Sequence, residues 1–267
     1  EGAASIIYVV QDPKTHQVWA LKHVEKHEHK DTRFLDQAIL EHEVAQKFSH
    51  EHLRRSERLI RRHALLRLTD VFVVMEFVDG ISMEKIPPRN DVELAVELFH
   101  QVALALAHMH DKGYVHADMK PNNIIVCENR IAKVIDLGQA CPIGTVKPRI
   151  QGTPDYIAPE QVHRRAITAR TDVYNFGATM YRLTTFQLPP NVLPTEGMKM
   201  KEKQFLGLLK PVRDLAPNTP PKLAELIEQC LQFDANKRPA GMTDIHNVLD
   251  TLADEAEAKL SPDELEG

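Results

Sequence analysis

A cluster of polar residues near the middle of the chain separates two apolar stretches. In the segment HADMKPNN, residues 116–123, Asp118, Lys120 and Asn123 surround a turn at Pro121. A helical pattern precedes the segment and an apolar strand pattern follows it, so the turn can direct these three side chains inward. A carboxylate, an ammonium group and a carboxamide gathered on one loop indicate polar catalysis rather than packing.

The pattern of this segment resembles the catalytic loop of the protein kinase superfamily, which reads HRDxKxxN. His116, Asp118, Lys120 and Asn123 match that pattern, whereas Ala117 stands in place of the family's arginine. The resemblance implies that Asp118 accepts the proton of the substrate hydroxyl and that Asn123 binds Mg²⁺. It also implies that His116 is a buried structural residue.

Further kinase motifs follow in the order that the family requires. The triplet Asp136-Leu-Gly is similar to the metal-binding DFG triplet, and GTPDYIAPE, residues 152–160, resembles the segment that receives the peptide substrate. The resemblance implies that Asp136 binds Mg²⁺ and that Thr153, together with Lys120, marks a serine/threonine kinase. The form APEQ, which ends at Gln161, is similar to bacterial kinases of the eukaryotic type.

Upstream of these motifs, VWALK, residues 18–22, is similar to the family's VAIK strand. The resemblance implies that Lys22 holds the α- and β-phosphates of ATP and that a helix carboxylate positions it. Glu41 is the favoured carboxylate, and Glu43 is the alternative. Gly2 matches the second glycine of the phosphate-binding loop GxGxxG, while Ser5 replaces the third.

The resemblance also implies where the nucleotide base lies. Met75 corresponds to the residue that limits the depth of the adenine pocket, and Glu76 to Val78 correspond to the hinge whose backbone binds adenine. ATP and Mg²⁺ are the implied cofactors. Further contacts to the nucleotide are expected from Ile7, Ala20 and Ile125.

Composition limits the other classes of function. The 267 residues carry a formal net charge of −5, which gives no basic field for nucleic acid. Cys127, Cys141 and Cys230 lack metal-binding spacing, so neither a disulfide framework nor a zinc site is expected. The longest apolar run, Val71 to Val78, is far shorter than the roughly 20 residues of a membrane helix. We expect a cytoplasmic domain that acts on proteins; a chain that opens at Glu1 leaves room for a longer, membrane-anchored parent protein.

The periodicity of apolar residues, together with the resemblance, predicts an α+β kinase fold of two lobes. The first lobe, residues 1–78, begins within the Gly-rich loop and is expected to contain a small sheet and one main helix. Its predicted elements are two strands within Ile6 to Val24 joined at Asp12-Pro13-Lys14, a helix from Asp31 to Phe48 with Asp31 or Thr32 as its cap, and a strand from Thr69 to Val78.

Residues 79–267 are predicted to form the hinge and a larger, mainly helical lobe. Asn90 is expected to cap its first helix with Glu93 as the second half of a capping box, and Gly113 to end it. The resemblance further implies that Asp172 is buried and that Arg238 pairs with Glu160. The predicted helices are Asn90 to Lys112, Asp172 to Thr184, Pro221 to Gln232 and Met242 to Ala253.

Two charged clusters allow more than one interpretation. His23, His27 and His29 could suggest a metal site, but the lysines around them favour a solvated loop. Six arginines between Arg54 and Arg67 indicate a solvated basic face, with docking of an acidic partner or substrate segment as the alternative.

The predicted function is transfer of the γ-phosphate of ATP to serine or threonine hydroxyls of proteins. Two alternatives are a kinase-fold binding module without catalysis and a small-molecule phosphotransferase. The complete set of Lys22, Asp118, Asn123 and Asp136 disfavours the first. Lys120 and the GTPDYIAPE segment disfavour the second.

The same motifs predict how the enzyme is regulated. In related kinases the arginine missing at Ala117 pairs with a phosphate on the activation segment. The usual position of that phosphate is occupied here by Arg149, which cannot accept one. We therefore expect activity that does not depend on phosphorylation of this segment.

Overall fold

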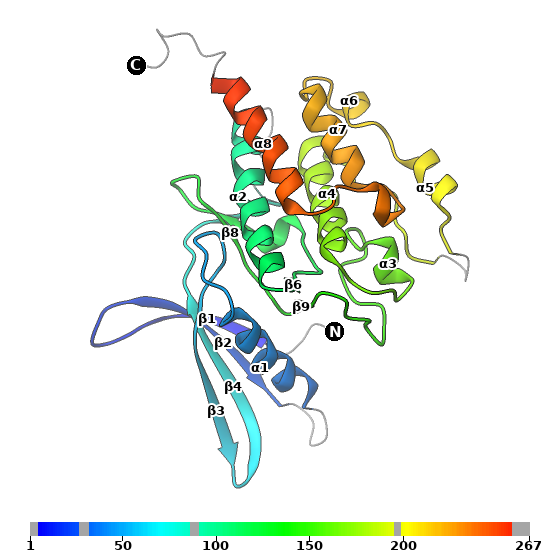
Figure 1. Cartoon of the computed structure of the whole chain (residues 1–267). Helices are drawn as coiled ribbons and strands as arrows, with labels where there is room; N and C mark the ends of the chain where they lie inside the picture. Colours follow the sequence, from blue (N-terminus) through cyan, green and yellow to red (C-terminus); the bar gives the residue numbers. More distant parts are fainter. Residues whose placement is uncertain (1–4, 27–31, 86–90, 195–198, 258–267) are drawn as a thin grey trace, which may run out of the picture.

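The computed structural model describes residues 5–26, 32–85, 91–194 and 199–257, and these residues form two lobes. A small lobe holds a four-stranded sheet with one helix, and a larger lobe is built mainly from helices (Figure 1). The predicted α+β architecture is confirmed.

The small lobe is an antiparallel sheet in the order β1-β2-β4-β3 with a helix packed against one face. Its elements are β1 (Ser5–Gln11), β2 (Val18–Glu25), α1 (Arg33–Ala45), β3 (Ser56–Ala64) and β4 (Arg67–Glu76). Ala20 and Val24 of β2 pack with Leu35 and Ala38 of α1. Because side chains alternate along a strand, Lys22 lies on the same, helix-facing side.

The hairpin of β1 and β2 is confirmed, but strand β3 contradicts the predicted order of strand, strand, helix, strand. Two strands follow α1, and they pair with each other as a long hairpin. Arg58, Arg61 and Arg62 lie on β3 and are exposed, which agrees with the predicted solvated basic face. The strand predicted from Thr69 to Val78 begins earlier, at Arg67, and ends at Glu76.

The predicted helix caps were only partly right. Helix α1 follows Thr32, whose hydroxyl bonds to the Asp36 carboxylate at 2.8 Å instead of capping the backbone, and Asp31 lies outside the described residues. The first helix of the large lobe is capped by Asp91, which accepts a hydrogen bond from the Leu94 amide at 2.9 Å. The predicted pair of Asn90 and Glu93 is therefore wrong.

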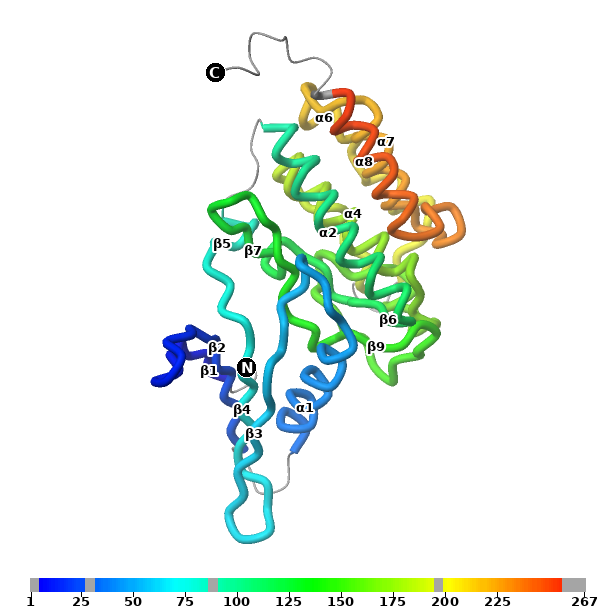
Figure 2. Tube along the Cα trace, turned by 60° about the vertical axis from the view of Figure 1, so that its left-hand side comes forward, coloured from blue at the N-terminus to red at the C-terminus, as the bar shows by residue number. Residues whose placement is uncertain are grey.

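The large lobe contains the predicted helices with ends shifted by a few residues. Helices α2 and α4 lie at its centre, α8 packs along α2, and α7 packs along α4 (Figure 2). Gly113, at a φ of 79°, ends α2 as predicted. The helices are α2 (Val92–Asp111), α3 (Pro159–Val162), α4 (Ala169–Thr185), α5 (Glu202–Leu208), α6 (Val212–Leu215), α7 (Pro221–Cys230) and α8 (Met242–Glu257).

Short strands and turns connect these helices and carry the residues of the predicted site. They are β5 (Ile81–Ser82), β6 (Tyr114–Val115), η1 (Pro121–Asn123), β7 (Ile124–Val126), β8 (Ala132–Val134), β9 (Cys141–Pro142) and η2 (Ala235–Lys237). Strands β5, β7 and β8 form one small sheet, and β6 pairs with β9.

Among the described helices, α2 alone is long and apolar enough to cross a bilayer by length and composition. Half of its most apolar window is buried, and residues such as Phe99 and Leu106 are fully enclosed in the large lobe. In this fold α2 is therefore a core helix.

A buried ion pair confirms one contact that the sequence predicted. The guanidinium of Arg238 binds both carboxylate oxygens of Glu160, at 2.8 and 3.0 Å. Its plane also lies over the Tyr174 ring, 4.8 Å from the centroid. A bidentate pair of this kind fixes orientation as well as distance. It joins α3, at the end of the GTPDYIAPE segment, to η2.

Candidate active site

The catalytic loop is held in place by a buried carboxylate. Asp172 of α4 accepts hydrogen bonds from the amides of His116 and Ala117, at 2.8 and 2.7 Å, and contacts the His110 ring at 2.9 Å. Burial favours the neutral form of Asp172, but these donors outweigh it and hold the pKa of that carboxyl below its ordinary value. The loop backbone is thereby fixed immediately before Asp118.

The backbone changes direction at Ala117, which has a left-handed φ of 61°. Its small side chain is buried with Val115, Cys141 and Ile167, where the family's arginine would need a charged partner. His116 is fully buried, as predicted. The loop thus turns on a small apolar contact and on the two amides that Asp172 binds.

Asp118 joins the catalytic loop to the GTPDYIAPE segment. Its Oδ1 atom accepts hydrogen bonds from the amide and the hydroxyl of Thr153, at 2.7 and 2.8 Å. Lys120 donates to Oδ2 of Asp118 at 2.9 Å and to the Thr153 hydroxyl at 2.7 Å. These three residues, which were predicted from two separate motifs, therefore form one hydrogen-bonded cluster.

Asn123 and Asp136 carry side-chain oxygen atoms of the kind that Mg²⁺ prefers, and they lie on segments joined by a backbone hydrogen bond. The Asn123 side chain donates its amide hydrogen to the Asp118 carbonyl at 2.9 Å, which leaves the carboxamide oxygen for a cation. The amide of Ile135, next to Asp136, donates to the Asn123 carbonyl at 2.8 Å. Within the described residues no three His, Cys, Asp or Glu gather as a metal cluster, so phosphate oxygens would complete the coordination.

Asp136 adopts a left-handed φ of 66°, and its Oδ1 accepts a hydrogen bond from the Gly138 amide at 3.1 Å. Desolvation disfavours its charge, but the Gly138 amide and the nearby Lys22 ammonium prevail, so the pKa of this carboxyl lies below its ordinary value. An ionised carboxylate in the cleft fits the predicted role as a magnesium ligand.

Lys22 and Glu41 form the expected ion pair across the small lobe. The Lys22 ammonium lies 2.6 Å from the Glu41 carboxylate, which is 8% exposed on α1. Glu43, the alternative, instead lies beside Arg61 on the exposed side of the helix. Gln37 donates to the Gly138 carbonyl at 3.4 Å, so α1 contacts the loop that carries Asp136.

The residues predicted to surround the adenine base lie on strands β1, β2, β4 and β7. Ala20 and Met75 are register partners on β2 and β4, and both are buried. Ile7 of β1 lies opposite Lys22, and Ile125 lies half-buried on β7. Their contacts to the nucleotide stay predictions, and Gly2 lies outside the described residues.

Fewer backbone groups of the hinge are free to bind adenine than the sequence predicted. The Glu76 amide donates to the Arg55 carbonyl at 2.9 Å, and the Glu76 carboxylate binds Lys133 at 2.6 Å. The amide of Glu76 is therefore used within the protein. The carbonyl of Glu76 and the backbone of Val78 stay as predicted contacts to adenine.

Arg54 is a member of this site that the sequence did not indicate. Its amide donates to the Val134 carbonyl at 2.9 Å, and its side chain lines a small space with Glu41, Met75 and Asp136. Burial lowers the pKa of the guanidinium, while the negative charges of Glu41 and Asp136 counteract that shift. Arg54 thus belongs to the interior behind the cleft rather than to a solvated basic face.

The activation segment is held by contacts that contain no phosphate. The Lys147 ammonium donates to the carbonyl and side-chain oxygens of Gln139, at 2.7 and 3.0 Å. Arg164 donates to the Pro148 carbonyl at 3.0 Å, and Gln161 donates to the Ala117 carbonyl at 2.8 Å. Lys147 was not singled out from the sequence, because its partner is a neutral side chain eight residues away.

An open groove of about 590 Å³ adjoins the Asp118 cluster and contains Lys120 and Thr153 in its lining. Glu84 and Arg182 face each other there, with 2.9 Å between the Glu84 carboxylate and the guanidinium. The groove therefore lies next to the Asp118 cluster through its lining residues Lys120 and Thr153.

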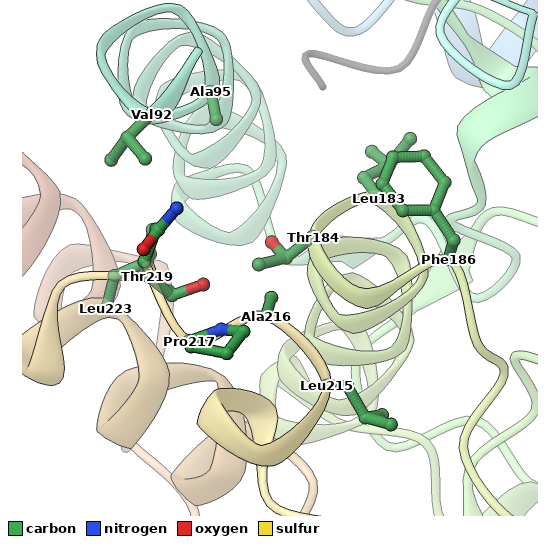
Figure 3. Close-up of a pocket in the computed structure, with 11 residues that line it drawn as sticks. Val92, Ala95, Leu183, Thr184, Phe186, Leu215, Ala216, Pro217, Thr219 and Leu223 are labelled. Atoms are coloured by element: carbon green, nitrogen blue, oxygen red, sulfur yellow. The ribbon is translucent and has the colours of Figure 1, made fainter. Parts of the chain in front are cut away.

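A second pocket, of about 410 Å³, lies among α2, α4 and the turn between α6 and α7 (Figure 3). Val92, Leu183, Leu215 and Thr219 are among its lining residues, none of which is charged. It lacks the carboxylates and cations that phosphoryl transfer needs.

Of the histidine cluster that was weighed as a metal site, the structure describes only His23. His23 lies 2.8 Å from the Asp70 carboxylate and stacks on the Phe72 ring. His27 and His29 lie outside the described residues. His23 therefore has a structural pairing within the sheet.

Comparisons with known proteins agree with this geometry. Residues 1–250 match the protein kinase domain family. The chain is 29% identical over 242 residues to a serine/threonine-protein kinase of Myxococcus xanthus, covering 80% of this chain and 28% of that protein. It is 33% identical over 131 residues to a serine/threonine-protein kinase of Mycolicibacterium smegmatis, covering 44% and 20% respectively.

A serine/threonine/tyrosine-protein kinase of Arabidopsis thaliana is 29% identical over 172 residues, covering 63% of this chain and 42% of that protein. The chain thus spans less than half the length of each of these relatives. The match of the family model to nearly the whole chain shows that this chain belongs to the protein kinase domain family.

Proposed function

We propose that this chain is a serine/threonine protein kinase, which transfers the γ-phosphoryl group of ATP to hydroxyl groups of proteins. The cluster of Asp118, Lys120 and Thr153 carries the proposal. It connects a carboxylate able to accept a proton with the segment that receives a peptide. Both parts are needed for a protein substrate, and they lie within hydrogen-bonding distance of each other.

In the proposed reaction the acceptor hydroxyl lies in the groove beside Asp118. The hydroxyl oxygen forms a bond to the γ-phosphorus, the bond from that phosphorus to the β-phosphate oxygen breaks, and ADP leaves. Asp118 takes the hydroxyl proton as this bond forms. Lys120 offsets negative charge near the transferred group, and Thr153 keeps the Asp118 carboxylate oriented.

The opposite side of the cleft orients the nucleotide. Glu41 holds the Lys22 ammonium so that it can bind the α- and β-phosphates. Asp136 and Asn123 would hold Mg²⁺, which neutralises charge on the phosphates when bound. Positioning and charge stabilisation account for most of the catalysis in this chemistry.

Arg54 completes the charge balance behind the nucleotide. Glu41 and Asp136 are two carboxylates near the same glycine: a methyl group on Gly138 would lie 3.1 Å from an Asp136 oxygen and 3.7 Å from a Glu41 oxygen. Two like charges this close repel each other. Arg54 lines the same small space as both carboxylates, and its positive charge offsets that repulsion, so we propose it as a positioning residue.

Two alternatives are weaker on this geometry. A binding module without catalysis has no need of the Lys22 to Glu41 pair together with the Asp118 cluster. A small-molecule phosphotransferase has no need of Thr153 and the segment that the Glu160 to Arg238 pair anchors. Both arrangements favour phosphoryl transfer to proteins.

We also propose that the active arrangement forms without phosphate on the activation segment. Lys147, Arg164 and Gln161 hold the segment through neutral oxygen atoms. Ala117 is enclosed among apolar side chains, so the catalytic loop presents no cation there for a phosphate. These contacts do the ordering that a phosphorylated residue does in related kinases.

Replacing the proton acceptor tests the proposed function. Asp118→Asn keeps the shape of the side chain but removes its basicity, so phosphate transfer from labelled ATP to a protein substrate should fall at least about a hundredfold. Asp111→Asn, on an exposed residue at the end of α2, serves as the control. Label should appear on serine or threonine. Equal rates for Asp118→Asn and the unaltered chain would contradict the proposal.

Removing phosphate tests the proposed regulation. The purified chain is treated with a protein phosphatase, its mass confirms complete dephosphorylation, and turnover should stay within about twofold because neutral contacts order the segment. Loss of most turnover would show that a phosphate is required. Lys147→Met should make the segment more susceptible to limited proteolysis and lower turnover, whereas Arg149→Ala should change neither.

The substitution Arg54→Met tests whether the Arg54 guanidinium has the proposed positioning role. Loss of a partly buried charge that faces two carboxylates should lower kcat/KM for ATP by roughly tenfold, which corresponds to about 1.4 kcal/mol. Arg55→Met, on the exposed neighbour, is the matched control. Rescue by Arg54→Lys distinguishes the charge from the bulk of the side chain. Unchanged kcat/KM in Arg54→Met would exclude the role.

A further inference from the structure

The long hairpin of β3 and β4 ends in a turn whose residue types are unusual for its conformation. Ala64 and Arg67 are register partners, so Leu65 and Leu66 alone make the connection. Turns of two residues favour Asn and Gly, because at least one residue must take a positive φ. Leu65 takes a φ of 55°, a conformation that costs energy for a leucine.

The two leucines are also fully in contact with water. Leu65 is 100% exposed and Leu66 is 98% exposed, whereas no other large apolar residue in the described ranges exceeds 63%. Leucine is therefore unfavourable at this turn for two reasons: the backbone conformation of Leu65 and the exposure of both side chains to water. Such double departures are typical of functional positions.

Basic residues surround this turn, and we refer to residues 61–67 as the hairpin tip. Between Arg58 and Thr69 the chain has four arginines and no carboxylate, although its formal net charge is −5. Arg61, Arg62 and Arg67 belong to the tip and are exposed. Glu43 lies 3.9 Å from Arg61 and is itself exposed, and Asp70, the register partner of Arg62, binds His23 and Thr69 through its carboxylate. The positive charge is thus local and faces outward.

The hairpin projects from the sheet away from the large lobe, which leaves its end free of other described elements (Figures 1 and 2). The projecting turn presents its two apolar side chains on a convex surface. A protein partner would need a pocket shaped for two leucines, whereas a bilayer accepts them without shape complementarity. Anionic headgroups would meet the arginines beside them.

We propose that the hairpin tip binds the surface of anionic membranes, with Leu65 and Leu66 inserted among the lipids and the arginines at the headgroups. The ten residues of β4 separate the tip from the hinge, a distance of roughly 30 Å at the usual rise per residue. The catalytic cleft therefore stays accessible above the membrane. Binding at this site does not depend on the proposed phosphoryl transfer.

Vesicle binding tests this proposal directly. The full chain is sedimented with vesicles of phosphatidylcholine and phosphatidylserine in equal parts, and with vesicles of phosphatidylcholine alone. We expect binding to the anionic vesicles that weakens at high ionic strength, because salt screens the arginines. Leu65→Asn with Leu66→Gly should lower the partition coefficient at least tenfold, since each leucine contributes roughly that factor when buried.

This double variant also separates binding from folding. Asn and Gly suit the turn, so Tm and kinase turnover should be unchanged or higher. Leu208→Asn, on a leucine that is 60% exposed on α5, is the control and should bind vesicles as the unaltered chain does. Arg61→Gln with Arg62→Gln should weaken binding to anionic vesicles by tenfold or more, at roughly fivefold for each arginine.

Two results would overturn the proposal. One is the absence of vesicle binding, or binding that the change at Leu65 and Leu66 leaves intact. The other is self-association in solution, measured by light scattering without vesicles, that the same double variant abolishes while vesicle binding persists. That second result would assign the hairpin tip to contact between copies of the chain.

Discussion

The structure depends on one buried carboxylate, that of Asp172. A fully enclosed charge is costly unless donors surround it, and here the donors are the amides of His116 and Ala117 and the His110 ring. The requirement to satisfy this charge fixes the backbone immediately before Asp118. Asp118 in turn binds Thr153 and Lys120. Hydrogen bonds therefore connect the central helix α4 to the catalytic loop, and that loop to the GTPDYIAPE segment.

Charges alternate across the cleft on the nucleotide side. The ammonium of Lys22 binds the Glu41 carboxylate, and Arg54 lines one small space with Glu41 and Asp136. This arrangement keeps helix α1 against the loop that carries Asp136 before any phosphate arrives. On the other side of the cleft, the Lys147 ammonium binds two oxygen atoms of Gln139 within the activation segment. Both sides are therefore ordered by groups encoded in the chain.

The sequence located the candidate catalytic residues because phosphoryl transfer fixes the types and the order of the residues that it needs. Asp118, Asn123, Asp136 and Lys22 could be located from short motifs, and the pairing of Glu160 with Arg238 followed from the same resemblance. Helix cores were also predictable, since their apolar residues recur at helical spacing. Contacts between motifs, such as the bond from Thr153 to Asp118, required the fold.

What the sequence could not indicate has physical reasons. Strand β3 has three arginines and no alternation of apolar and polar residues, and it ends in a turn of two leucines, so neither its pattern nor its end carries the usual signal. Arg54 is one of six arginines between Arg54 and Arg67, so the sequence does not distinguish it from the others. Only the fold places it in one small space with Glu41 and Asp136. Asp91 rather than Asn90 caps α2, because two adjacent cap-forming residues cannot be separated by type alone.

The central claim is that the Thr153 hydroxyl couples the peptide-receiving segment to the proton acceptor. It donates to Asp118 at 2.8 Å and accepts from Lys120 at 2.7 Å. Single-turnover phosphate transfer compared between Thr153→Ser and Thr153→Val tests it, because only serine keeps the hydroxyl. We expect Thr153→Ser to retain most of the rate and Thr153→Val to lose roughly tenfold to a hundredfold, the usual effect of removing a hydrogen bond to a charged group. Equal rates for the two variants would contradict the account.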